Sequence, residues 1–213
     1  SECRSISYSD GTYGIKNLRT GEITLKGITW MFASEAYTDS LVIYSKNYRR
    51  GYFNRFTGEA VIPEQYTHAW IFSEGLAAVV KEDKVGFIDR RGEVVIDFQY
   101  PYLKDNDRRV DFVFHEGYCS MYDEEGKCGI INNKGEWVVK PQYDYVQNPL
   151  YGKRVFIQDG KYGLMDDSLH IVIPAEYRYI TQTSDYAIVS RWDESRMQMS
   201  YKGEILNPML YDM

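Results

Sequence analysis

A short unit recurs along this chain of 213 residues, and the repetition constrains the fold more than any other feature. Five copies have a glycine inside an apolar run, and the last has Met197 in its place. In five copies a Gly-Glu pair follows, beginning at Gly21, Gly58, Gly92, Gly135 and Gly203. A tyrosine then recurs as Tyr66, Tyr100, Tyr143, Tyr177 and Tyr211, at spacings of 34, 43, 34 and 34 residues. Such a fixed period indicates a repeat architecture in which every unit is one supersecondary element.

Each unit is predicted to form a small antiparallel meander of short strands. The first strand is expected in successive units at residues 41–46, 76–81, 118–123, 154–159 and 186–191. The second strand carries the glycine, the third is the β-branched run after Gly-Glu, and a shorter fourth segment after the tyrosine completes the unit. Asp10-Gly11, Glu125-Gly126 and Asp159-Gly160 are typical hairpin turns, because glycine accepts the positive φ that such turns need. The six units start near Arg4, Leu41, Leu76, Tyr118, Arg154 and Tyr186.

Consecutive apolar residues within the strands predict that both faces of each small sheet are covered. Phe87-Ile88 and the run 94–96 do not alternate, as a sheet with one wet face would. Glycine inside a strand marks a place where another group comes close, and we expect the repeated tyrosine ring to pack on or near it. On this pattern Trp137, in a third strand, is expected in the core.

The predicted fold class is all-β: six short β-meander repeats forming one domain over residues 1–213. A propeller-like closed array is favoured, because neighbouring blades cover each other's faces and closure protects the ends. An open β-solenoid or superhelix is the alternative, and its end units would need polar caps.

Several segments match the pattern of a known family. The run 72–79 (Phe-Ser-Glu-Gly-Leu-Ala-Ala-Val), the run 135–144 and the run 172–177 carry its motifs. On these motifs the chain resembles the bacterial WG-repeat (KWG-repeat) proteins. The signature tryptophan is replaced here by Tyr13, Arg50, Val85, Cys128, Tyr162 and Arg196. The resemblance implies a non-enzymatic, mostly bacterial and often extracytoplasmic β repeat module, and it implies no particular ligand.

Candidate binding residues come from the tryptophans and from one insertion. Trp70 and Trp192 lie outside the most regular strand positions and are expected to be exposed, where aromatic platforms bind sugars or proteins. The third unit is nine residues longer than the others, within residues 102–116. Insertions in repeat proteins fall in loops that often carry function, so its charged residues are further candidates: Asp105, Asp107, Arg108 and Arg109.

No catalytic or metal-binding constellation is predicted. The three histidines His68, His115 and His170 occupy different positions of different units, and the spacing of Asp105-Asn106-Asp107 does not match a calcium loop. Phosphate-loop, dinucleotide and nucleophile-elbow motifs are absent from the sequence, so no cofactor is expected. Three scattered cysteines do not form a disulfide framework, and Cys119 and Cys128 are expected as buried thiols on adjoining strands of one hairpin.

Composition limits the partners. The net charge of −6 weighs against nucleic-acid binding, and no apolar run is long enough for a transmembrane helix. The chain begins at Ser1, which is compatible with a removed secretory signal, and a monomer in the periplasm or at the bacterial cell surface is expected.

The predicted function is a non-enzymatic binding or scaffold module for a protein or glycan ligand of the bacterial cell envelope. One alternative is a polysaccharide-acting enzyme with carboxylates on the 102–116 insertion or in a central cleft. The other is a purely structural domain.

Overall fold

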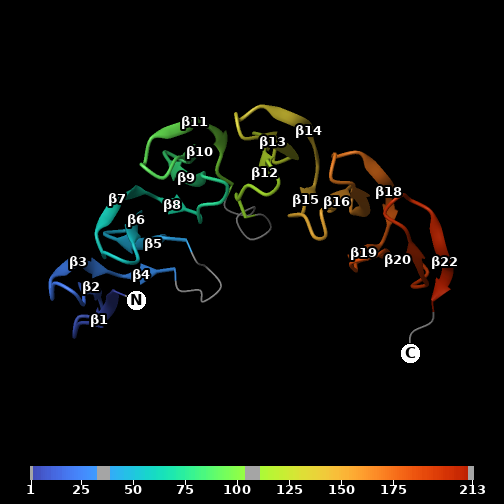
Figure 1. Ribbon diagram of the computed structural model, residues 1–213. Coiled ribbons are helices and arrows are strands. Elements are labelled where there is room, and N and C mark those ends of the chain that lie inside the picture. Colours follow the sequence, from blue (N-terminus) through green and yellow to red (C-terminus); the bar gives the residue numbers. More distant parts are fainter. Residues whose placement is uncertain (1, 33–38, 104–110, 211–213) are drawn as a thin grey trace. The chain divides into compact units, whose positions relative to one another are not determined.

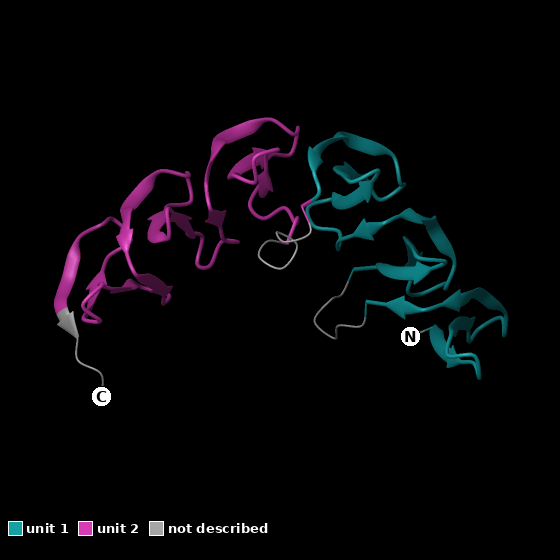
Figure 2. Ribbon diagram, turned by 180° about the vertical axis from the view of Figure 1, so that it is seen from behind, with its two compact units in different colours: residues 1–102 teal, residues 103–213 magenta. Residues whose placement is uncertain are grey.

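The computed structural model describes residues 2–32, 39–103 and 111–210, and these residues contain strands and turns but no helix (Figure 1). None of the described elements is therefore a helix long and apolar enough to cross a membrane. The chain divides into two compact units, residues 1–102 and residues 103–213, shown in teal and magenta in Figure 2. The structure has six small antiparallel sheets, three in each unit, which we number in chain order. The predicted all-β class of six short meanders is confirmed.

Unit 1 contains sheets 1 to 3. Sheet 1 consists of β1 (Cys3–Ser7), β2 (Tyr13–Asn17) and β3 (Ile23–Ile28). Sheet 2 consists of β4 (Trp30–Met31), β5 (Leu41–Lys46), β6 (Arg49–Asn54) and β7 (Ala60–Tyr66). Sheet 3 consists of β8 (His68–Ala69), β9 (Ala77–Lys81), β10 (Lys84–Ile88) and β11 (Val94–Pro101).

Unit 2 contains sheets 4 to 6. Sheet 4 consists of β12 (Tyr118–Tyr122), β13 (Cys128–Asn132) and β14 (Trp137–Tyr143). Sheet 5 consists of β15 (Tyr145–Val146), β16 (Arg154–Gln158), β17 (Lys161–Met165) and β18 (Ile171–Tyr177). Sheet 6 consists of β19 (Tyr179–Gln182), β20 (Ala187–Ser190), β21 (Arg196–Met199) and β22 (Ile205–Leu210).

The short segment after Tyr66, Tyr143 and Tyr177 belongs to the next sheet, which corrects the predicted assignment to its own unit. After Tyr66, β8 pairs with β9 of sheet 3 and not with a strand of sheet 2. The same shift places β15 and β19 beside the first long strands of sheets 5 and 6. Sheets 2, 3, 5 and 6 thus each include a short strand, β4, β8, β15 and β19, from the preceding sequence repeat, whereas sheet 4 has only three strands among the described residues. Backbone hydrogen bonds therefore link those sequence repeats.

The turn glycines have the conformation that the sequence predicts. Gly11, Gly126 and Gly160 close the first hairpins with φ of 85°, 78° and 77°. The glycines of the Gly-Glu pairs also have positive φ, a region that residues with a Cβ rarely adopt. An Asn, Asp or Ser at the start of these turns accepts hydrogen bonds from the turn amides, as Asn132 does from Lys134 and Glu136. The recurring Glu thus stands in a structural turn.

The glycine inside the second long strand makes room for the third strand. A Cβ on Gly51 would lie 2.4 Å from the carbonyl oxygen of Ile62, and one on Gly129 would lie 2.4 Å from that of Val139. The pairing of the second and third strands shifts register at this point, which brings the backbone inward. Close approach at the glycine is confirmed.

The repeated tyrosine does not lie on that glycine. The rings nearest to Gly86 and Gly163 are those of Phe98 and Phe156. Tyr66 stacks on Phe98 with the ring centroids 6.5 Å apart, and Tyr143 meets Phe156 edge-on at 4.8 Å. Tyr66 and Tyr143 thus reach the following sheet and pack against the ring that touches its glycine, so they lie near the glycine, as one form of the prediction has it, and not on it.

The two residues after the glycine position face opposite neighbours. Ile15, the first residue after the glycine in sheet 1, packs in one cluster with Phe53, the second residue after the glycine in sheet 2. Tyr52, the first residue in sheet 2, packs in a cluster with Ile88 of sheet 3. In unit 2, Leu164 and Met199 share a cluster in the same way. Within each unit the core is therefore a series of layers between successive sheets, in which the first residue points to the next sheet and the second to the preceding one.

The third long strand lies at the edge of each sheet, and there the prediction of two covered faces was wrong. Val94 and Val95 are exposed and only Ile96 is buried, whereas β9 and β10 are buried on both faces. Trp137 occupies the corresponding edge position and is 37% exposed, so it is not a core residue. An edge strand has a neighbour on one side only, and the prolines Pro63, Pro141, Pro174 and Pro208 lie in these strands, where the missing N–H disrupts least.

An ion pair links repeats 2 and 3. Arg90 donates a hydrogen bond of 2.7 Å to Asp39, whose other carboxylate oxygen accepts one from the Leu41 N–H at 2.9 Å. Burial raises the pKa of Asp39, but the hydrogen bonds from Arg90 and Leu41 outweigh it, so the net pKa is lowered. The carboxylate therefore stays ionised in the folded chain at a pH where the unfolded chain takes up a proton.

This pKa gives a pH-dependent prediction. The stabilisation by Asp39 is fully present above its ordinary pKa of about 3.9 and is lost as the pH falls through the lower folded value. We expect Asp39→Asn to unfold at a lower urea concentration than the native chain at pH 7. The difference should shrink below about pH 4. Asp97→Asn, at an exposed position of β11, is the control and should leave the urea midpoint unchanged at both pH values. A gap that widens on acidification would contradict the assignment.

Candidate functional site

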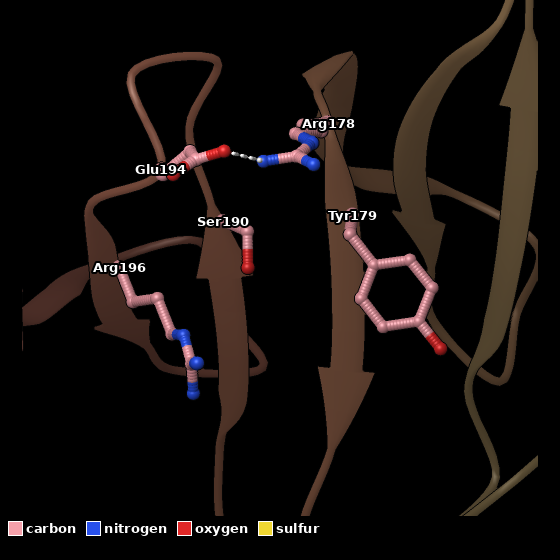
Figure 3. Close-up of a pocket in the computed structure, with 5 residues that line it drawn as sticks. All are labelled: Arg178, Tyr179, Ser190, Glu194 and Arg196. Atoms are coloured by element: carbon pink, nitrogen blue, oxygen red, sulfur yellow. Dashed lines mark hydrogen bonds and ion pairs between the residues drawn. The ribbon is translucent and has the colours of Figure 1, made fainter. Parts of the chain in front are cut away.

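A hollow on sheet 6 brings together aromatic, hydroxyl and guanidinium groups. Its volume is about 400 Å³, and it is lined by Arg178, Tyr179, Ser190, Glu194 and Arg196. The strand register explains the arrangement, because Tyr179 pairs with Ser190 and Ser190 pairs with Arg196, so the three lie in one row across β19, β20 and β21. Figure 3 shows Ser190 between the other two.

An ion pair closes one end of the hollow. Arg178 donates to Glu194 at 3.2 Å, and both side chains are largely exposed. Glu194 lies in the turn between β20 and β21 and has a φ of 72°. The turn thus aims Glu194 at β19 (Figure 3). Because the pair is exposed to water, its contribution to stability is small, and its carboxylate and guanidinium remain available to a ligand.

Tyr179 supplies the aromatic surface of the site. Its ring is 48% exposed and lies 5.1 Å from the ring of Tyr162 in the preceding sheet. Burial, and next the neighbouring Tyr179, raises the pKa of Tyr162, so this supporting phenol stays neutral at physiological pH. The row therefore offers a ring face and hydrogen-bond donors side by side, a combination that suits carbonyl-bearing, anionic or sugar ligands.

A related row occurs in sheet 2. Trp30 pairs with Ser45, and Ser45 pairs with Arg50, which repeats the aromatic–Ser–Arg order of sheet 6. The guanidinium of Arg50 lies 4.9 Å from the centroid of the Trp30 ring. Arg50 and Arg196 are two of the residues that replace the signature tryptophan. This shared replacement, with an aromatic residue and a serine upstream, is the sequence signal that could have located the site.

The structure places the predicted tryptophans differently from one another. Trp192 is 59% exposed and lies in the turn that also carries Glu194, and its indole N–H donates to the Glu176 carbonyl at 2.9 Å. Trp70 is partly buried and belongs to an aromatic cluster with His68 and Tyr102.

The remaining candidates are not brought to this site. Asp105, Asp107, Arg108 and Arg109 lie outside the described residues. The predicted hairpin of Cys119 and Cys128 is confirmed, with Cys119 on β12 and Cys128 on β13, and both thiols are buried and outside any disulfide. Burial raises the pKa of Cys128 to about 12, which makes it an unreactive thiol at neutral pH. Sequence reasoning missed Arg178, Tyr179, Ser190, Glu194 and Arg196.

Several solved structures are similar to the chain. The chain is similar to Hsv2 of Kluyveromyces lactis, with a TM-score of 0.50, 8% identity, and coverage of 93% of this chain and 71% of that chain. BamB of Moraxella catarrhalis has a TM-score of 0.45 at 12% identity, covering 99% and 73%. The WD40 β-propeller domain of Doa1 has a TM-score of 0.38 at 12% identity, covering 100% and 79%. At 8% identity the likeness to Hsv2 concerns the fold alone.

The sequence comparisons identify the repeat. None of the curated proteins matches the chain. The family model described as WG containing repeat matches residues 51–84, 86–107 and 129–162. These segments fall in both units, and sheet 1, the rest of sheet 5 and sheet 6 have the same consecutive antiparallel strand order. The chain therefore contains repeats of the WG type in both units.

Proposed function

We propose that the chain is a non-enzymatic binding module whose ligand contacts the hollow of sheet 6. The observation that supports this function is the exposed row of Tyr179, Ser190 and Arg196 on adjacent strands. Tyrosine and arginine are the residue types that most often dominate binding energy, because a rigid ring or a planar guanidinium makes large contacts at low entropic cost. The ligand class at this level is a protein or a glycan.

Binding is favoured over catalysis by the composition of the hollow. Of the five residues that line it, Glu194 alone has a carboxylate, and that carboxylate is paired with Arg178. Hydrolysis of a glycosidic bond generally needs two carboxylates on either side of the scissile bond. The site instead resembles a recognition surface, with one aromatic anchor and several donors.

We further propose an extracytoplasmic place in a bacterial cell envelope, which rests on the resemblance to WG-repeat proteins. Fractionation of the native host with an antibody against the full chain tests it. Recovery in the periplasmic or surface fraction is expected, and recovery with cytoplasmic markers would contradict it.

Substitutions in the row test the proposed function. We expect Tyr179→Ala to weaken binding to the best-bound member of a glycan array or peptide array at least tenfold, because the aromatic anchor is lost. Tyr48→Ala is the matched control, since Tyr48 is 92% exposed on a turn of unit 1. Affinity of each purified full-length variant is measured by calorimetry. Equal affinity of Tyr179→Ala and the native chain for that ligand would place the binding surface elsewhere.

A further inference from the structure

Side-chain donors of one sheet hold the short first strand of the next. In sheet 2, Arg50 donates to the Ala69 carbonyl at 3.4 Å and Tyr52 donates to the Trp70 carbonyl at 2.7 Å. Ala69 belongs to β8, the short strand that the following sheet acquires. The donors of β6 therefore bind two successive main-chain carbonyls of an extended segment.

Unit 2 contains a second hydrogen bond from a side chain of one sheet to the main chain of the next sheet's short strand. Ser120 of β12 donates to the Val146 carbonyl of β15 at 2.8 Å. Val146 in β15 occupies the same register position as Ala69 in β8, since Val146 pairs with Phe156 and Ala69 with Val79. The equivalent carbonyl is thus bound in two junctions by different donor residues. The recognised feature is the main chain of the segment rather than one side chain.

Sheet 6 presents donors at the positions that do this in sheet 2. Arg196 pairs with Ser190 as Arg50 pairs with Ser45. Gln198 pairs with Ile188 as Tyr52 pairs with Ile43. Arg196 and Gln198 are two residues apart on β21, so their side chains leave the same face of the sheet. That face also carries Tyr179 and Ser190.

The same face of sheet 6 has polar residues where the corresponding face of sheet 2 has apolar ones. Tyr52 pairs with Ile62 in sheet 2, and both are fully buried, whereas Gln198 pairs with Asn207 in sheet 6. The first residue after the glycine position is apolar in the other five repeats: Ile15, Tyr52, Phe87, Ile130 and Leu164. A face with amides in place of these residues tolerates water and keeps the hydrogen-bonding part of the interface. Such a face suits a reversible partner.

Charge disfavours a second copy of this chain as the occupant. The face of sheet 1 that points away from sheet 2 carries Arg4 and Lys16 in directly paired positions. Lys16 stands where the other repeats have Phe53, Ile88, Ile131, Met165 and Met199. Head-to-tail stacking would set these cations against Arg196. Like charges brought together in an interface oppose association.

We propose that the face of sheet 6 binds an extended polypeptide segment of a partner protein, with Arg196 and Gln198 donating to its main-chain carbonyls as Arg50 and Tyr52 do to β8. This inference rests on the proposed function of sheet 6 as the binding surface, and it specifies the ligand class. Tyr179 packs against a side chain of the segment. Because the donors bind main-chain carbonyls, the surface accepts varied sequences of extended form.

The probe is a peptide with the sequence of residues 66–74, acetylated and amidated at its ends, added to the full-length chain labelled with nitrogen-15. We expect chemical-shift changes at the Arg196 and Gln198 side chains. The double variant Arg196→Met and Gln198→Met should bind the peptide at least tenfold more weakly, whereas Arg91→Met, at an exposed arginine of unit 1, should bind as the native chain does.

An ester substitution tests the main-chain contact directly. Replacing the amide that joins Ala69 to Trp70 in the peptide by an ester weakens the carbonyl acceptor of Ala69 and leaves the side chains in place. Affinity should fall severalfold. An ester between Ser73 and Glu74, away from the bound carbonyls of Ala69 and Trp70, should have little effect. Equal affinity of the two esters would overturn the proposal.

A set of neutral and uronic-acid oligosaccharides is tested in parallel, and sedimentation velocity monitors self-association. Binding of oligosaccharides but not of the peptide overturns the inference and leaves the proposed binding function intact. Self-association through this face, abolished by the double variant, likewise overturns the inference in favour of a second copy. If neither peptide nor oligosaccharide binds and the chain stays monomeric, both proposals fail.

Discussion

Gly51→Ala should lower the free energy of unfolding by about 3 kcal/mol, because a Cβ at this position has no space. It would lie 2.4 Å from the Ile62 carbonyl oxygen and 2.7 Å from the Glu64 amide nitrogen. Both are backbone atoms at a register shift, so they cannot rotate away as a side chain would. A melting temperature lower by roughly 6 to 12 °C is expected for a chain of this size, measured by calorimetry.

Gly86→Ala provides the graded control for this prediction. The atoms nearest to its added Cβ are 3.0 Å away, and two of the three belong to the Phe98 ring. A ring can shift by a few tenths of an ångström, so the expected loss is only about 1 kcal/mol. If the two variants were equally stable, the backbone of the third strand would not be what excludes a side chain at Gly51.

Tyr52→Ala should cost about 4 kcal/mol, the other large effect that we expect. Tyr52 has no exposed surface, meets Phe72 edge-on at 4.9 Å, and donates its hydroxyl to the Trp70 carbonyl. Its removal leaves a cavity between sheets 2 and 3 and deletes the link to the next short strand. Chemical denaturation of the purified chain measures the loss.

Two variants separate the contributions of the ring and the hydroxyl. Tyr52→Phe keeps the ring and should cost only about 1 kcal/mol, the usual contribution of one hydrogen bond. Tyr48→Ala removes a tyrosine that is 92% exposed and should change stability by less than about 0.5 kcal/mol. A Tyr52→Phe variant as unstable as Tyr52→Ala would mean that the hydroxyl, and not packing, dominates the junction.

The two effects have one cause in the layered core. Because each sheet is small, its stability depends on both neighbours, and a substitution between sheets disturbs two of them at once. The residue after the glycine position is therefore the most sensitive position in an interior repeat. In sheet 6 the same position holds Gln198, which is half-buried. A substitution there should affect binding more than stability.

The all-β class, the six meanders and the turns were predictable from local sequence. Strand periodicity, turn glycines and the recurring tyrosine are properties of short segments, and the first long strands lie within a residue of their predicted bounds, as β5 and β16 show. Of the predicted binding residues, only Trp192 lies beside the candidate site. The row of Tyr179, Ser190 and Arg196 was missed because it depends on the register of three consecutive strands, and β19 was assigned from the sequence to the preceding unit.

The sequence by itself determined the repeated unit, since glycine, tight turns and β-branched runs act within a few residues of the chain. Only the tertiary structure decided which sheet each short strand joins, which apolar residues face water, and where the tyrosine rings lie. Those outcomes depend on which neighbouring sheet pairs with or packs against each strand. Trp137 shows the difference: its residue type favours a core strand, but its strand is an edge, and one side of an edge has no partner to cover it.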